Sequence, residues 1–138
     1  MNEYTLRAKK QIEESGFTLV YCNGKEVITS DVRGVRPLFE IVREKGSMKG
    51  FYCADKVVGK AAAFMYAILK PEELYAFVLS EKAESVLRKY GIKYWGGETV
   101  PAIKNRRGDG FCPMETATEK AETPEEAFGI LEEKLIQE

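Results

Sequence analysis

The feature that most constrains this fold is an apolar run from Ala61 to Leu69, near the middle of the chain. A surface helix carries one apolar stripe, whereas a helix that is apolar all round has to be buried. We therefore predict that residues 50–69 form a short strand, a turn and a helix at the centre of the domain. The polar residues of this stretch gather at the start of the expected helix, which makes that end a candidate site.

The rest of the pattern predicts an α/β fold. Apolar runs and turn signals alternate in the order β-β-α-β-α-β-α-β and are followed by further helices. Besides the central pair, the expected strands are 17–22, 25–30, 74–79, 92–95 and 99–103, and the expected helices are 2–15, 34–45, 80–90, one opening at 112–115 and one starting at 123. Asn23 and Gly24 predict a type I′ turn between the first two strands. This order favours a three-layer α/β/α architecture with a mixed central sheet of about five strands.

Composition narrows the range of functions. A chain of 138 residues fits one domain, 1–138. Its 21 basic and 22 acidic residues give a net charge of −1, so we expect neither a nucleic-acid nor a membrane partner. The three cysteines are an odd number without a C-x-x-C pair, which predicts a cytoplasmic location. Histidine is absent, and with it the commonest general base and zinc ligand.

The first polar cluster lies at the expected start of the central helix. We predict Asp55 as the N-cap, with Lys56 and Lys60 on one helix face. Cations at a positive helix end are unfavourable by about a few tenths of a kcal/mol, which indicates a bound anion. The alternative is that both lysines are solvated or pair with Asp55. Gly59 indicates a close approach by another backbone or by a ligand, helix–strand packing being the simpler cause.

The second cluster is the basic, glycine-rich loop 104–111. Its Asn105, Arg106, Gly108 and Gly110 are the residue types that wrap a phosphate with backbone N–H groups and a guanidinium fork. A solvated turn explains the same composition without a ligand.

The third cluster is the helix start at Cys112, Pro113 and Glu115. Proline at the first helical position and glutamate at the third fit a helix with Cys112 as N-cap. A thiol at a helix start, near arginines, has a lowered pKa and is a candidate nucleophile. A buried, inert cysteine is the alternative.

Two of these stretches resemble the family known as domain of unknown function 1893. They are residues 54–63, with the sequence ADKVVGKAAA, and the segment from Asn105 to Glu115 that contains CPME. The resemblance covers about residues 17–135 and leaves the helix at 1–15 outside the family core. It implies a cytidine deaminase-like fold, in which two helix starts face each other.

The resemblance also bears on metal binding. Zinc deaminases open one helix with H/C-x-E and the next with P-C-x-x-C. The overlay places Cys53 and Asp55 at the first motif and Cys112 and Glu115 at the second, so that Asp replaces the catalytic Glu and a carboxylate replaces one thiolate. We therefore predict no metal and no cofactor, and rank zinc-dependent deamination as a minor alternative.

The overlay implies that Asp55, Lys56, Lys60, Cys112 and Glu115 converge at one pocket beside the loop 105–110. Such a pocket suits a nucleotide-like or other small anionic ligand. One hypothesis is an enzyme in which Asp55 or Glu115 is the acid/base, Lys60 or Arg106 steadies negative charge, and Cys112 is a nucleophile. The alternative is a non-catalytic binding or regulatory module. Whether the chain is an enzyme or forms a homo-oligomer stays open.

Overall fold

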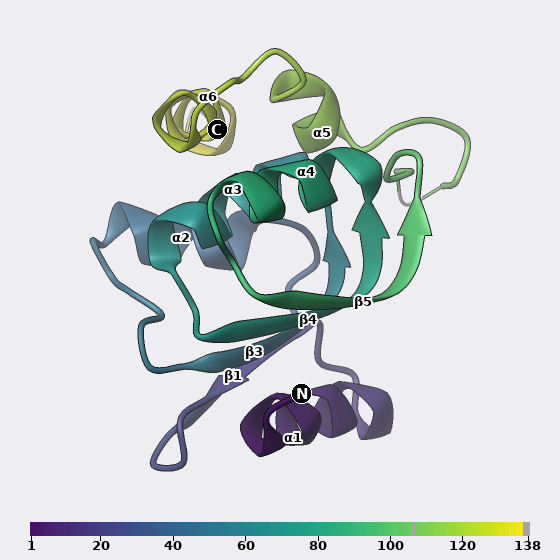
Figure 1. The fold of residues 1–138 in the computed structure, drawn as a ribbon. Coiled ribbons are helices and arrows are strands. Elements are labelled where there is room, and N and C mark those ends of the chain that lie inside the picture. The colour runs from purple at the N-terminus through teal and green to yellow at the C-terminus, as the bar shows by residue number, and fades with distance from the viewer. Residues whose placement is uncertain (106, 137–138) are drawn as a thin grey trace.

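The computed structural model describes residues 1–105 and 107–136 and shows one five-stranded sheet in the order β2-β1-β3-β4-β5 (Figure 1). The strands are β1 (Leu19–Cys22), β2 (Val27–Ser30), β3 (Tyr52–Val58), β4 (Glu73–Ser80) and β5 (Tyr94–Val100). The helices are α1 (Glu3–Glu14), α2 (Arg36–Arg43), α3 (Lys60–Leu69), α4 (Glu81–Lys89), α5 (Pro113–Ala117) and α6 (Pro124–Ile136). Strand β1 pairs antiparallel with β2 and β3, whereas β3, β4 and β5 run parallel. The predicted α/β fold with a mixed five-stranded sheet is confirmed; the cytidine deaminase-like label stays a prediction.

Helices cover both faces of the sheet. Figure 1 shows α1 alone on one face and the other helices on the opposite one. As its composition predicts, α3 is buried over almost its whole length, with α2, α4 and α6 packed around it. Ala8 and Ile12 of α1 pack on β1 and β3, so this helix docks on its own chain. Among the described residues, no helix combines the length and apolarity needed to cross a membrane.

The turn between β1 and β2 differs from the predicted type I′ turn. Gly24 has a φ of +87°, but Asn23 does not have a positive φ. Instead, the Asn23 side-chain oxygen accepts the backbone N–H groups of Lys25 and Glu26, at 3.0 and 2.9 Å. This side-chain turn is a local alternative that asparagine offers the backbone, and it delays the second strand until Val27.

The boundary between the central strand and helix is also not where the pattern placed it. Strand β3 continues to Val58, and α3 begins only at Lys60 with Gly59 as N-cap. Pairing with β1 and β4 keeps these residues extended, and valines favour a strand. The predictions that Asp55 is the N-cap and that Lys56 and Lys60 share a helix face are therefore wrong.

Strand β5 is continuous, whereas two separate pieces were predicted around Gly96 and Gly97. A Cβ at Gly97 would lie 2.7 Å from the Phe77 carbonyl oxygen and 2.8 Å from the Tyr75 hydroxyl. Here glycine marks a close approach between strands rather than the end of one.

This contact leads to a stability prediction. Gly97→Ala is expected to lower the free energy of unfolding by about 1–3 kcal/mol, because backbone atoms of β4 have to move. The matched control is Gly129→Ala in α6, where nothing lies within 4 Å of the new methyl group and where helix propensity favours alanine by about 0.5–1 kcal/mol. Urea denaturation of both variants checks the pair, and equal shifts would contradict this account of Gly97.

Candidate functional site

The start of α3 holds a carboxylate that belongs to the protein itself. One carboxylate oxygen of Glu115, in α5, accepts the backbone N–H of Lys60 at 2.5 Å and that of Ala61 at 3.4 Å. A Cβ at Gly59 would lie 2.5 Å from the Glu115 carboxyl carbon, so glycine leaves room for this group. Free N–H groups and the helix dipole both favour negative charge here. The start of α3 is thus an anion cradle, consisting of Gly59, Lys60 and Ala61, with Glu115 as its occupant.

The Lys60 side chain makes a second contact, with Glu119 just after α5. Its ammonium donates to the Glu119 carbonyl oxygen at 2.5 Å and lies 5.8 Å from the Phe64 ring centroid. Partial burial, followed by the nearby Lys82 charge, lowers the pKa of Lys60. Lys82 itself forms an ion pair with the Glu119 carboxylate at 3.5 Å. The segment that supplies Glu115 is therefore held at two points, the middle of α5 and Glu119 just beyond its end.

Asp55 lies inside the protein, on the side of β3 that faces α3. Only 9% of it is exposed, and the Tyr66 hydroxyl donates to its carboxylate at 2.6 Å. Burial raises the pKa of Asp55 from 3.8 to about 7, although the Tyr66 hydrogen bond opposes this shift. Burial also raises the pKa values of the neighbouring Cys53 and Tyr66. Asp55 is a buried acid that titrates near neutral pH.

The other two predicted residues, Lys56 and Cys112, are placed differently: Lys56 is in strand β3, and Cys112 is at the start of the helix that carries Glu115. Lys56 is exposed on β3, and its backbone N–H donates to the Thr18 carbonyl oxygen. Cys112 is the partly buried N-cap of α5, as predicted, and its own N–H donates to the Ile103 carbonyl oxygen. Cys112 thus lies at the start of the short helix that carries Glu115, whereas Lys56 belongs to the sheet.

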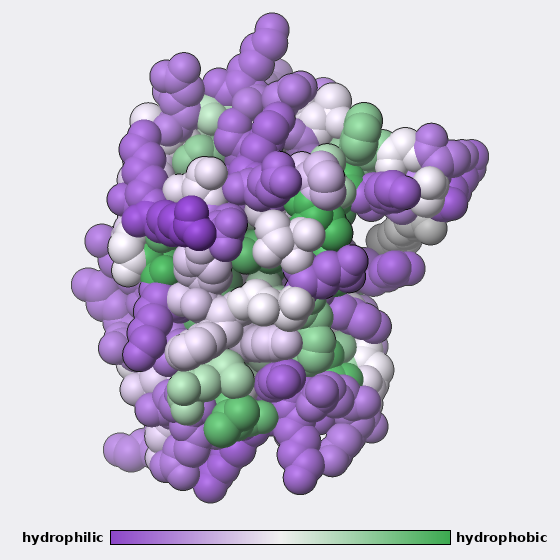
Figure 2. Space-filling view, turned by 45° about the vertical axis from the view of Figure 1, so that its right-hand side comes forward, coloured by the Kyte–Doolittle hydropathy of each residue, from purple (hydrophilic) through white to green (hydrophobic). Residues whose placement is uncertain are grey.

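The loop 104–111 is organised around Asn105. Its side-chain oxygen accepts the Gly108 N–H at 2.9 Å, and its amide donates to Asp109 at 3.1 Å. A Cβ at Gly110 would lie 3.3 Å from the Asn105 amide nitrogen. Figure 2 shows this segment projecting from the molecule with mostly hydrophilic side chains. The loop uses its own asparagine where a phosphate was predicted; Arg106 lies outside the described residues.

The predicted convergence is therefore partial. Lys60, Gly59 and Glu115 meet at the cradle, and Cys112 is nearby in sequence on α5. Beside Glu115 is a hollow of about 150 Å³, which Lys82, Phe111 and Glu119 also line. It is smaller than the ligand pockets of about 300 Å³ and more that enclose a small molecule. Asp55 is not among its lining residues.

The zinc set that the deaminase overlay implies does not fit these residues. Cys53 and Asp55 lie within β3, away from the helix start, and the Cys53 thiol contacts the Met48 sulfur at 3.6 Å. The Glu115 carboxylate already accepts hydrogen bonds from α3. In the described part of the chain, no group of three or more metal-ligating side chains is placed to hold an ion.

Sequence reasoning missed Tyr66 as the partner of Asp55. A signal was present, since a lone hydroxyl in a helix that is otherwise apolar needs a hydrogen-bond partner when buried. Sequence reasoning also missed Glu115 as the occupant of the cradle, because the hydrogen bond that places it there joins Lys60 and Glu115, which are 55 positions apart.

Comparisons with known proteins give a consistent result. The family described as Domain of unknown function (DUF1893) matches residues 7–135. The crystal structure of a DUF1893 family protein from Thermotoga maritima is similar, with 28% sequence identity and a TM-score of 0.89. The match covers 97% of this chain and 91% of that one. No curated protein matches this chain.

Proposed function

This chain belongs to the DUF1893 family, and we propose that it binds a small anionic molecule at the start of α3, in the cradle of Gly59, Lys60 and Ala61. The observation that carries the proposal is the Glu115 carboxylate on the N–H groups of Lys60 and Ala61. A carboxylate or phosphate oxygen of a ligand would accept the same two hydrogen bonds. Glu115 is then a stand-in that the ligand displaces.

The size of the site supports a particular mode of binding. The hollow of about 150 Å³ beside Glu115 has room for an anionic group but not for an enclosed nucleotide. A nucleotide-like ligand would place its phosphate in the cradle and the rest of the molecule outside it, against the exposed Phe111. Binding requires Glu115 to leave, so the apparent affinity is the intrinsic affinity multiplied by the fraction of molecules in which the cradle is open.

Catalysis at this site would use Cys112 and Glu115, which α5 carries together. Asp55, the third predicted catalytic residue, is enclosed beneath α3 and bonded to Tyr66, so it would act only if α3 moved. This enclosure favours the second candidate function, a non-catalytic regulatory module in which ligand binding releases α5. Displacement of Glu115 is the signal in that case, because α5 also contacts α6.

Removal of the internal carboxylate should improve binding. For Glu115→Ala, we expect inorganic phosphate to bind at least about tenfold more tightly than to the unmodified protein, because a charge-assisted hydrogen bond no longer competes. The measurement is a phosphate titration followed by the amide NMR signals of Lys60 and Ala61. Phosphate should shift these two amides at lower concentration in the variant.

The matched control is Glu132→Ala, which removes the same charge from an exposed position of α6 that does not line the hollow. We expect its phosphate affinity to stay within about twofold of the unmodified protein, since exposed charges are screened. If Glu115→Ala lowers stability without any gain in phosphate binding, Glu115 is only a helix cap and the proposal fails.

A further inference from the structure

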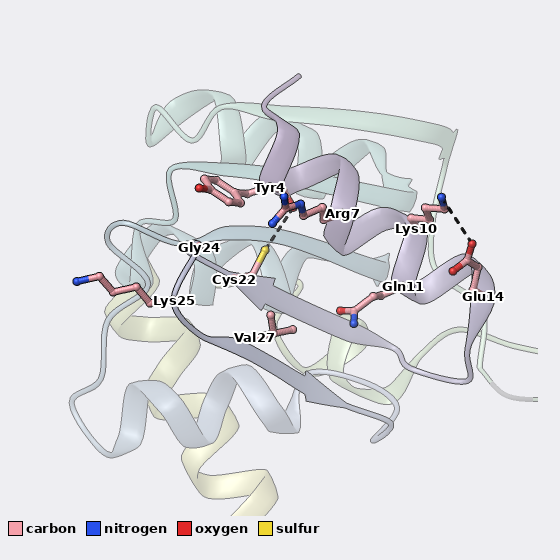
Figure 3. Close-up of a pocket in the computed structure, with 9 residues that line it drawn as sticks. All are labelled: Tyr4, Arg7, Lys10, Gln11, Glu14, Cys22, Gly24, Lys25 and Val27. Atoms are coloured by element: carbon pink, nitrogen blue, oxygen red, sulfur yellow. Dashed lines mark hydrogen bonds and ion pairs between the residues drawn. The ribbon is translucent and has the colours of Figure 1, made fainter.

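A second hollow lies on the opposite face of the sheet, between α1 and the β1–β2 hairpin. Its volume is about 380 Å³, within the range of small-molecule pockets. Its lining includes Arg7, Gln11, Cys22, Lys25 and Val27. Figure 3 shows Arg7 and Gln11 extending from α1 toward the hairpin, with Val27 on the β2 side. We call this hollow the α1–hairpin groove.

The groove carries positive charge that the protein does not neutralise. Lys10 and Glu14, which also line it, form an exposed ion pair at 3.9 Å. Arg7 and Lys25 have no ion pair with a carboxylate in the part of the chain that the structure describes. Two unpaired cations therefore border one groove in a chain whose net charge is −1. Figure 3 shows the Lys25 side chain extending outward from the turn, so Lys25 places its charge at the rim of the groove and Arg7 places its charge inside.

The walls of the groove are held at fixed positions. The Arg7 guanidinium lies 5.4 Å from the Tyr4 ring centroid, and Tyr4 packs on Tyr52 at 5.6 Å. The Cys22 thiol donates to the Tyr4 carbonyl oxygen at 3.3 Å, which joins β1 to α1. At Gly24, a Cβ would lie 2.7 Å from the Tyr4 hydroxyl, so the turn and the helix are in close contact. The Arg7 guanidinium is thus held at the edge of a closely packed contact between α1 and the hairpin.

We propose that the α1–hairpin groove binds a small phosphate monoester, with Arg7 as the principal contact to the phosphate and Lys25 as the second cation. A guanidinium fork matches the geometry of a phosphate. Two unpaired cations favour a group with close to two negative charges, which a phosphate monoester carries near neutral pH. Tyr4, Cys22 and Val27 give the groove an apolar floor for the organic part of the ligand. This site does not depend on the α3 cradle, which lies on the other face of the sheet.

The test uses phenyl phosphate as the probe and the backbone amide NMR signals of the whole protein as the readout. We expect saturable shifts at Arg7, Gln11, Gly24 and Lys25. The double variant Arg7→Gln/Lys25→Gln should weaken binding at these amides at least about tenfold, since the charge-assisted contact of Arg7 and the positive charge of Lys25 at the rim are both lost. Glutamine is a good helix former, and both positions are exposed, so the variant should fold.

The control double variant, Arg33→Gln/Lys49→Gln, removes the same charge from exposed positions outside the groove. Its affinity should stay within about twofold of the unmodified protein. Equal weakening in both double variants would show attraction by overall charge and overturn the proposal. Equally tight binding of benzoate would overturn the phosphate assignment. Shifts confined to Lys60 and Ala61 would overturn this site while supporting the cradle.

Discussion

We expect Asp55 to make the free energy of unfolding fall as the pH rises from about 4 to about 7, and we expect most of this fall to disappear in the Asp55→Asn variant. The folded-state pKa of Asp55 is raised to about 7 from the ordinary 3.8, so the folded protein holds a proton that the unfolded chain has released. Stability therefore falls as pH rises through this window. The difference of about three pKa units corresponds to a loss on the order of 4 kcal/mol at higher pH.

Urea denaturation of both proteins at pH 5 and pH 8.5 measures this effect. The stability of the unmodified protein relative to Asp55→Asn should fall between the two pH values, and a constant difference would contradict the assignment. Taking the difference cancels other titrating groups. The groups that face Asp55 and its partner are Tyr66 from α3, Cys53 from β3 and Tyr21 from β1, all neutral when protonated.

Tyr66→Phe provides the matched comparison. The Tyr66 hydroxyl donates to the Asp55 carboxylate and so lowers its pKa. Without this hydrogen bond, the pKa of Asp55 should rise further, and the loss of stability should move to higher pH. A carboxyl carbon signal of Asp55 that titrates by NMR gives the same information directly.

Glu73→Ala should lower the free energy of unfolding by about 2–4 kcal/mol and loosen α1. Glu73 is 2% exposed at the start of β4, and its carboxylate accepts the Asn2 backbone N–H at 2.8 Å. Burial acts to raise the pKa of Glu73, but the hydrogen bond from the Asn2 backbone N–H and the nearby Lys93 ammonium lower it overall. The substitution leaves the partly buried Asn2 N–H at the start of α1 without its acceptor, which is costly.

The specific readout for Glu73→Ala is amide hydrogen exchange, which should accelerate in α1 more than in α3. Lys93→Ala is the control, because the Lys93 ammonium lies 3.4 Å from Glu73 but its side chain is 68% exposed. An exposed partner contributes little, so we expect a cost below about 1 kcal/mol. If Lys93→Ala cost as much as Glu73→Ala, the ion pair rather than the anchoring of α1 would be responsible. Because α1 forms one wall of the α1–hairpin groove, Glu73→Ala should also weaken phenyl phosphate binding there.

Elements with local signals were predicted at their observed positions. The Ser80 hydroxyl accepts the Ala83 N–H, as an N-cap should, and α4 follows directly. The Thr123 hydroxyl likewise accepts the Glu126 N–H at the start of α6. Such signals join residues three positions apart, so they are readable without knowledge of the fold.

The candidate site was predicted less completely, because its contacts join distant parts of the chain. Gly59 was correctly identified as a point of close approach, but the approaching group is the Glu115 side chain. Asp55 was singled out as important, yet sheet pairing with Leu19 and Ala76 places it in a strand instead of at a helix start. The partner of Asp55 and the occupant of the cradle both depend on packing.

The sequence by itself determined that the central helix is buried, that the sheet is mixed, and that negative charge is favoured at a helix start. Each of these follows from apolar periodicity, turn residues and the exposed N–H groups of any helix. Only the tertiary structure decided that Glu115 supplies that charge, that Asp55 is enclosed with Tyr66, and that α1 and the hairpin form the α1–hairpin groove. Packing decides these features because a buried or crowded polar group takes whichever partner the fold brings within hydrogen-bond distance.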